Sequence, residues 1–370
     1  MLKKVTEEPS ISWKNFSIIF VLLFDTLAWF FMTPIIIKKL LSNLSATNMQ
    51  ELIFLSAYSI AIIGSSAVGS ILVNRISRLK LLYSWIILGV ITSLLPALLT
   101  NLTLVHVLII SVLLGISFGL GMPSCLAYFA DYTLFDNRGR IGGIIFLITN
   151  LSAPLLAIVL SMFSSLVINS IIIASWRASG LIVFFLKPEE KMALETRRET
   201  SFMSVLNNKS FVLYFVAWLM FCLIDRFEWP ILKDFFGDFY NVVFMISPLI
   251  VSFSVFIAGI LSDWIGRKRM VLYGFVTLGI AYAIIGIAPG NPLSRYFYLA
   301  VNGIAIGILW VNFIFILWGD MSQPGTREKY YVIGEIPFFL TDIMQTLSAP
   351  LVMLIPAASA FSLASFFLFL

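Results

Sequence analysis

Apolar runs of about 20 residues recur along the whole chain, separated by short polar segments. Each run is long enough to cross a bilayer as a helix, because the hydrocarbon core needs about 20 helical residues. The pattern therefore predicts twelve membrane-spanning helices, over residues 15–37, 51–73, 80–100, 103–130, 139–162, 165–186, 210–232, 240–261, 269–288, 295–319, 330–353 and 357–370. The last run has only about 14 residues, so we expect the sequence to end inside its final helix.

The longest polar stretch, residues 187–209, lies between the sixth and seventh runs. It predicts a linker between two bundles of six helices, residues 1–186 and 210–370. An internal repeat supports this division, because several segments recur 189 residues later. The matched pairs are Ile71–Arg78 with Ile260–Arg267, Asp131 with Asp320, and Arg138 with Arg327. Duplicated membrane halves commonly enclose a central substrate path.

Composition supports an all-α integral membrane protein. Hydrophobic residues make up 60% of the chain and charged residues 12%, against about 25% charged residues in soluble domains. One histidine and two cysteines make a structural zinc site improbable on ligand number alone. The sequence has no P-loop and no H-E-x-x-H motif, so we expect no enzyme, cofactor or metal site.

Lys and Arg are distributed unequally between the two sides of the predicted membrane. The N-terminus, the linker and the loops on that side carry 18 of them, and the opposite loops carry four. Basic loops stay in the cytoplasm, so we expect a cytoplasmic N-terminus and linker in a cell or plasma membrane. The same bias explains the formal charge of +5 without a nucleic-acid partner. We expect a monomer in the bilayer.

The segment Gly259–Arg269 reads GILSDWIGRKR, and it resembles the signature loop of the major facilitator superfamily. In that family the loop follows helix 2 and recurs after helix 8, which is where this copy lies. The first copy is degenerate, with Asn74 in place of the aspartate and Ser77 in place of the glycine. The resemblance covers the whole chain and implies two six-helix bundles that open alternately to the two sides.

Charged residues of the repeat are candidates for a latch that holds the cytoplasmic side closed. Gly266 suits a tight turn, because glycine accepts a positive φ. Acid and base pairs at a membrane boundary can form and break as the two halves move. We expect this role for the repeated residues Asp263, Gly266, Arg267, Asp131, Arg138, Asp320 and Arg327. The alternative is a static anchor that only keeps the loops in the cytoplasm.

Polar groups inside membrane helices are candidates for substrate or proton sites, because burying them is unfavourable. The candidates are Asp25, Trp29, Asp225, Glu228, Asp342, Gln345, Asn150 and Asn312. Asp25 and Asp342 lie near the middle of their spans. Structural hydrogen bonds between helices are the alternative for the polar groups, and solvation beyond the end of the helix for Asp225 and Glu228. Arg177 either pairs with an acid or reaches toward the cytoplasm, and we expect Glu335 to join the latch.

These features predict a secondary transporter that moves a small solute by alternating access. Buried acids and the lack of an ATP-binding motif favour proton coupling. The first alternative is an uncoupled facilitator of a polar solute such as a sugar. The Asp131-x6-Arg138 element resembles the corresponding loop of sugar porters and favours this alternative mildly. A remote alternative is a membrane sensor that binds a ligand without transporting it.

Overall fold

The computed structural model describes residues 11–99, 101–190, 201–352 and 354–369, except the side chains of residues 342, 346 and 348–350. Every regular element in these ranges is a helix. The first half contains α1 (Trp13–Asn43), α2 (Asn48–Leu72), α3 (Arg78–Leu98), α4 (Leu104–Gly119), α5 (Met122–Tyr132), α6 (Arg138–Met162), α7 (Leu166–Ser179) and η1 (Gly180–Leu186). The linker contains α8 (Phe202–Leu206). The second half contains α9 (Lys209–Phe236), α10 (Phe239–Ile265), α11 (Arg267–Ile287), α12 (Pro292–Trp310), the π-helical η3 (Val311–Ile316), α13 (Leu317–Met321), α14 (Arg327–Val352) and α15 (Ala357–Phe369).

Ten continuous helical stretches of the described chain are long and apolar enough to cross a membrane. They correspond to the first ten predicted spans, and α14 and α15 correspond to the last two. Two spans are not uniform α-helices. The fourth is interrupted between α4 and α5, and the tenth contains the π-helical turn η3. These two irregular spans are partners in the repeat.

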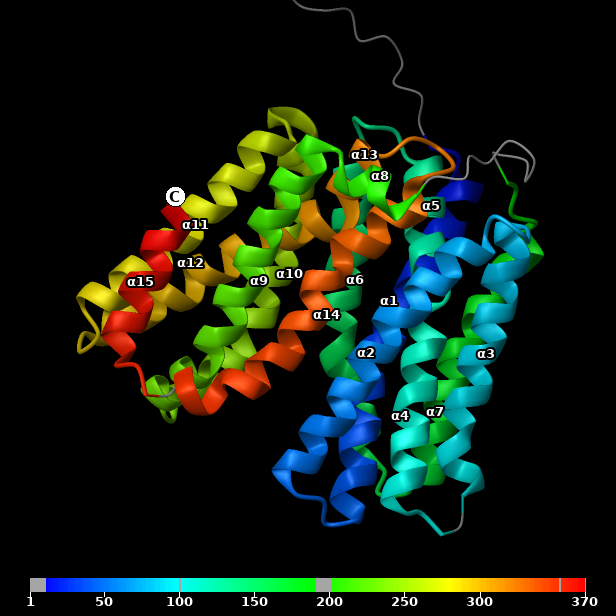
Figure 1. Cartoon of the computed structure of the whole chain (residues 1–370), viewed down its shortest axis with the longest axis horizontal. Coiled ribbons are helices and arrows are strands. Elements are labelled where there is room, and N and C mark those ends of the chain that lie inside the picture. The colour runs from blue at the N-terminus through cyan, green and yellow to red at the C-terminus, as the bar shows by residue number, and fades with distance from the viewer. Residues whose placement is uncertain (1–10, 100, 191–200, 353, 370) are drawn as a thin grey trace, which may run out of the picture.

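Figure 1 shows α1–α7 on one side of the molecule and α9–α15 on the other, joined at the top and separated at the bottom. The main contacts between the two sides are α6 with α10 and α2 with α14. The α6–α10 crossing is tight, because a Cβ atom on Gly259 would lie 2.2 Å from the carbonyl oxygen of Gly139. Glycine at this crossing lets the two backbones meet.

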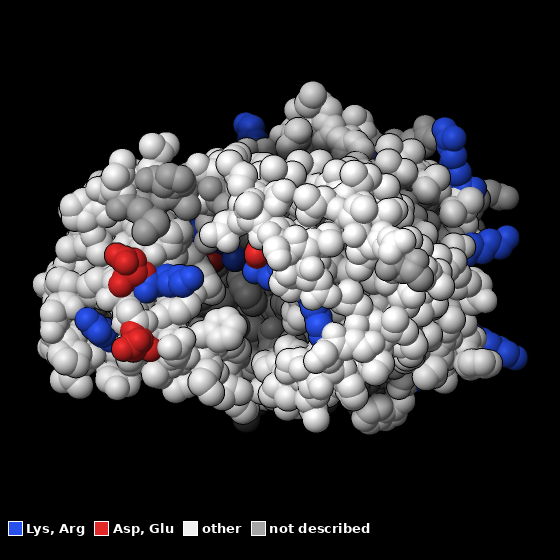
Figure 2. Space-filling model, turned by 90° about the horizontal axis from the view of Figure 1, so that it is seen from below, with Lys and Arg blue, Asp and Glu red and all other residues white. Residues whose placement is uncertain are grey.

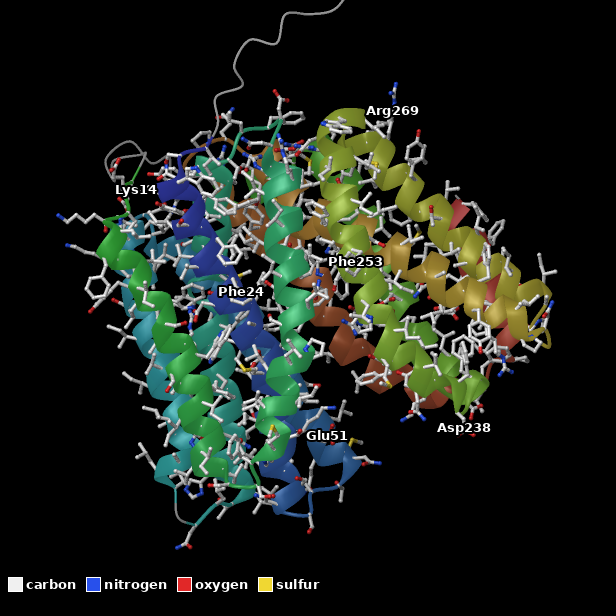
Figure 3. All side chains as sticks on the ribbon, turned by 180° about the vertical axis from the view of Figure 1, so that it is seen from behind. Lys14, Phe24, Glu51, Asp238, Phe253 and Arg269 are labelled. Carbon is white, nitrogen blue, oxygen red and sulfur yellow. The ribbon has the colours of Figure 1, made fainter. Side chains whose placement is uncertain are left out.

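The two ends of the molecule differ. We call "latch end" the end that carries the loops at residues 73–77, 133–137, 266 and 322–326, and "open end" the opposite one. Figure 3 places Lys14 and Arg269 at the latch end and Glu51 and Asp238 at the open end. Seen from the open end, the surface is hollowed between the two sides (Figure 2).

The two copies of the signature loop turn by different means. Gly266 has a φ of 99°, as predicted for a tight turn that favours glycine. Ser77, its counterpart, has a φ of −62° and accepts a hydrogen bond from the amide of Lys80. A serine N-cap begins α3 where a glycine begins α11. The first loop is therefore a complete turn despite its degenerate sequence.

The start of the linker is held against the latch end. The Lys14 ammonium donates to Glu189 at 2.7 Å, and this bond lowers the pKa of the exposed Glu189 carboxyl. The Tyr132 hydroxyl donates to the Glu189 carbonyl at 2.5 Å, and the Leu79 amide donates to Glu190 at 2.8 Å. The linker thus contacts α1, α3 and α5 close to the charged groups described next.

Candidate functional site

Asp131 binds arginines from both halves of the chain. Arg78 at the start of α3 donates to one of its oxygens, and Arg327 at the start of α14 donates to the other at 2.6 Å. The Asp131 side chain is 6% exposed and Arg327 is 11% exposed. Charge-assisted bonds of this kind are about twice as strong as neutral ones. Asp131 therefore cross-links the two halves.

Asp320 repeats this arrangement with the halves exchanged. Arg267 at the start of α11 donates to it at 2.9 Å from the same half. Arg138 at the start of α6 donates to it from the other half. The two carboxylates thus form equivalent bridges, each between one arginine of its own half and one of the other. The repeat seen in the sequence is an approximate two-fold symmetry of ion pairs across the latch end.

Asp263 adds a third bridge. Its carboxylate accepts hydrogen bonds from the backbone amides of Gly139 at 2.9 Å and Arg140 at 2.7 Å, in the first turn of α6. It also pairs with Arg267 at 2.7 Å. A carboxylate at a helix N-terminus is stabilised by the unpaired amides and the helix dipole. Asp263 of one half therefore caps a helix of the other.

The first copy of the loop has Asn74 where the second has Asp263, and a different acid supplies the missing charge. Glu328, in the first turn of α14, accepts hydrogen bonds from Arg78 at 3.0 and 2.5 Å. Arg78 and Glu328 are 6% and 3% exposed. Arg78 therefore has two carboxylate partners, as Arg267 does, but one comes from the opposite half. The degenerate motif retains its charge balance.

We expect Glu328→Gln to loosen the latch end and Asn74→Asp to restore it in the double variant. Loss of a hydrogen bond to a charged group changes stability by about 1.5–3 kcal/mol, or at least tenfold in an opening equilibrium. Hydrogen exchange at the Gly139 and Arg140 amides measures that opening. Equal exchange in Glu328→Gln and the parent chain would contradict this account. Glu51→Gln is the control, because Glu51 pairs with Lys38 outside the network.

A second charged group lies inside the first half. Arg177 of α7 pairs with Asp25 of α1, and the two side chains are 0% and 2% exposed. Arg177 also donates to Thr26 at 2.9 Å. Its guanidinium lies 4.2 Å from the ring centre of Trp85 and 5.2 Å from that of Trp29. Of the two alternatives for Arg177, pairing with an acid is confirmed, and it lies within the α1–α7 bundle.

The acids of α9 are buried inside the second half. Asp225 and Glu228 are 9% and 5% exposed, and one Glu228 oxygen has no hydrogen-bond partner. Both carboxyl groups are close enough to Tyr282 and Tyr298 to act on them electrostatically. The helix does not end before these two acids, because α9 continues to Phe236.

The remaining polar candidates are dispersed. Asn312 donates to the carbonyl of Ile308 at 2.8 Å and accepts from Ser262 at 2.7 Å, which are contacts within and between helices. Asn150 is buried on α6 with its amide nitrogen unbonded. Gln345 lines a cavity near the open end. The side chain of Asp342 lies outside the described residues.

Two adjoining cavities lie between the halves. The inner one, of about 770 Å³ with open solvent included, reaches from Leu27 and Phe30 on α1 to Tyr331 and Glu335 on α14. The outer one, of about 730 Å³, is lined by Pro34, Tyr58 and Gln345 among others. Phe30 and Phe339 line both cavities, with ring centres 6.0 Å apart at 85°. An aromatic pair thus separates an inner chamber from an outer one.

The position of Glu335 was not predicted correctly from the sequence. We expected it to join the latch, but it lines the inner cavity and takes part in no ion pair among the described side chains. Its sequence spacing from Asp342, two helical turns, was a signal that both lie on one face. That spacing gave no information about the depth of the inner cavity.

Comparison with known proteins identifies the family. The family model of the Major Facilitator Superfamily matches residues 16–317. A search of curated proteins found no match. Among solved structures, the proton:xylose symporter XylE bound to 6-bromo-6-deoxy-D-glucose aligns with a TM-score of 0.69 and 16% identity, over 96% of this chain and 94% of that one.

Two further structures align over nearly their whole length. The human organic anion transporter MFSD10 (TETRAN) has a TM-score of 0.74 and 15% identity, over 96% of this chain and 99% of that one. A bacterial homologue of the iron transporter ferroportin, in an outward-facing state, has a TM-score of 0.71 and 14% identity, over 97% and 98%. At these identities the likeness shows the fold alone. Because the family model matches most of its length, the chain belongs to the major facilitator superfamily of membrane transporters.

Proposed function

We propose that this transporter is a proton-coupled secondary transporter, and that the structure represents the state closed at the latch end and open at the other. The observation that carries the proposal is the set of ion pairs between halves at one end, opposite a cavity that opens at the other. Alternating access needs such a bistable arrangement. The moving bodies are residues 1–186 and 210–370, joined by the linker 187–209.

The latch end is the cytoplasmic one in this proposal. It carries Lys14 and Arg269 (Figure 3), the start of the linker at Glu189 and Glu190, and the basic loops of the sequence, and basic loops favour the cytoplasm. The state represented is therefore outward-open. Asp131, Arg138, Asp263, Arg267, Asp320 and Arg327 act as the latch, because their bonds between halves must break for the cytoplasmic side to open.

Asp25 is the proposed proton site. A carboxylate that shares a buried pair with Arg177 carries a charge that a proton can cancel, and cancelling it frees the arginine. Trp29 and Trp85 face the same guanidinium, so a change at Asp25 alters packing between α1, α3 and α7. Asp225 and Glu228 offer a second candidate proton site in the other half, and Asp342 remains a candidate from its position along α14.

Proton flux in proteoliposomes loaded with a pH-sensitive dye tests the coupling. We expect a solute-dependent pH change when sugars, organic anions, amino acids and lipophilic cations are offered in turn. Empty liposomes and protein-containing liposomes without solute are the controls. Solute counterflow without a pH change would refute the coupling and support the uncoupled facilitator. Binding without any flux would support the sensor.

A further inference from the structure

The inner cavity is walled by aromatic rings from both halves. Phe30, Phe118 and Phe146 come from the first half, and Trp310, Phe338 and Phe339 from the second. The rings touch in pairs across the interface, with ring centres 5.8 Å apart for Phe146 and Trp310. The wall is therefore almost entirely apolar and aromatic, as is common in sites that bind small organic molecules.

Few polar side chains line this cavity, and two of them already form hydrogen bonds within the protein. The Tyr331 hydroxyl donates to the carbonyl of Phe315 at 2.8 Å, and the Ser66 hydroxyl donates to that of Gly119 at 3.1 Å. The other two polar groups are the carboxyl of Glu335 and the indole N–H of Trp310. A sugar presents several hydroxyls that each need a partner, and this wall does not provide them.

Glu335 decides the sign of the charge that the cavity accepts. It is the only ionisable carboxyl among the described lining residues, and no lysine or arginine is among them. Its Oε1 atom is shielded from solvent and has no hydrogen-bond partner. The indole of Trp318 lies close enough to influence this carboxyl. The guanidinium carbon of Arg226, on α9, lies 5.4 Å from the ring centre of Phe338. Arg226 itself is not among the described residues that line the cavity.

We infer that the inner cavity binds a lipophilic organic cation, with Glu335 as its counter-ion and the aromatic rings enclosing its apolar groups. A positive charge gains from a carboxylate in an apolar site and from the faces of aromatic rings. An anion would meet Glu335 with the same sign of charge. The inference rests on the proposed transport function, because it names the substrate class of the same central path.

Equilibrium binding of tetraphenylphosphonium to the purified full chain tests the inference. We expect saturable binding, and Glu335→Gln should weaken it at least about tenfold, which corresponds to about 1.4 kcal/mol. Glu335→Asp keeps the charge and should retain most of the affinity, which covers the case in which the glutamine variant fails to fold. Glu51→Gln, at the exposed Lys38 pair, should leave the affinity unchanged. The neutral triphenylphosphine oxide and the anion tetraphenylborate report whether charge matters.

Three results would overturn the inference. They are equal affinity in Glu335→Gln and the parent chain, equally tight binding of the neutral or anionic compound, and no binding of tetraphenylphosphonium. In each case proton-linked flux of a different solute would leave the proposed function standing. Failure of that function itself appears differently, as cation binding without any flux or pH change across the membrane.

Discussion

Asp25→Asn is expected to destabilise the protein by about 3–5 kcal/mol, because it leaves Arg177 as a buried charge without its counter-ion. Arg177 is fully buried, and two of its guanidine nitrogens already have no hydrogen bond. The remaining partner, Thr26, is neutral. Thermal unfolding of the purified chain in detergent measures the loss, which should appear as a fall in melting temperature of several degrees.

The double variant Asp25→Leu, Arg177→Met separates stability from function. Replacing both members of a buried pair with apolar residues is often neutral or stabilising, so the melting temperature should return to that of the parent chain. The proposed proton site is nevertheless gone, and solute-dependent proton flux should be lost. A double variant that is stable and still moves protons would exclude Asp25 from coupling. Glu51→Gln is the matched control, since an exposed pair contributes about 0–1 kcal/mol.

Much of the fold was predictable from the sequence because the membrane constrains it strongly. The lengths of the apolar runs predicted the helix ends to within six residues, since a helix must span the hydrocarbon core with its backbone bonds satisfied. The repeat predicted which loops carry related charges. It also predicted the turn at Gly266, whose φ is 99°. None of these inferences required knowledge of how the two bundles meet.

The pairing of the charges was not predictable in the same way. In the sequence Arg138 follows Asp131 and Arg327 follows Asp320 at the same spacing. In the structure Arg138 pairs with Asp320, and Arg327 pairs with Asp131. Residues seven apart share a helix face only when one helix contains both, and here a loop separates α5 from α6. Which half supplies a partner depends on how the bundles meet. The compensation of Asn74 by Glu328 has the same origin.

The depth of the inner cavity was likewise not predictable from the sequence. Counting residues along α14 put Glu335 toward the cytoplasm, yet the inner cavity extends as far as Tyr331, one turn further in that direction. Its depth depends on how side chains from both halves pack against one another. Long-range packing of this kind leaves no local signal, whereas the ion pair of Asp25 and Arg177 had one, because intramembrane charges tend to pair.

Asp320→Asn is expected to shift the transporter from the state closed at the latch end toward one open there. The substitution removes the carboxylate that holds Arg138 and Arg267, whose side chains are 5% and 6% exposed. Breaking a buried pair from one side typically costs about 3–5 kcal/mol, and the bond to Arg138 exists only while the halves meet. A change of about 3 kcal/mol alters the ratio of the two states more than a hundredfold.

Spin labels on cysteines at Lys80 and Arg269 measure that shift. Both positions are exposed at the latch end, on α3 and α11, and they are equivalent in the repeat. The native Cys125 and Cys222 are buried. We expect short distances in the parent chain and predominantly long ones in Asp320→Asn. Asp136→Asn is the control, because Asp136 is an exposed acid of the neighbouring loop that forms none of these bridges.

The symmetry of the ion-pair network leads to a second prediction, for Asp131. Asp131 holds one arginine of each half as Asp320 does, so Asp131→Asn should lengthen the Lys80–Arg269 distance to a similar extent. Combining the two substitutions should open the latch end almost completely, because the remaining bridges of Asp263 and Glu328 must then hold four arginines. If either single variant kept the parent distances, that carboxylate would be an anchor for its own loop, and the latch role would fall to Asp263 and Glu328.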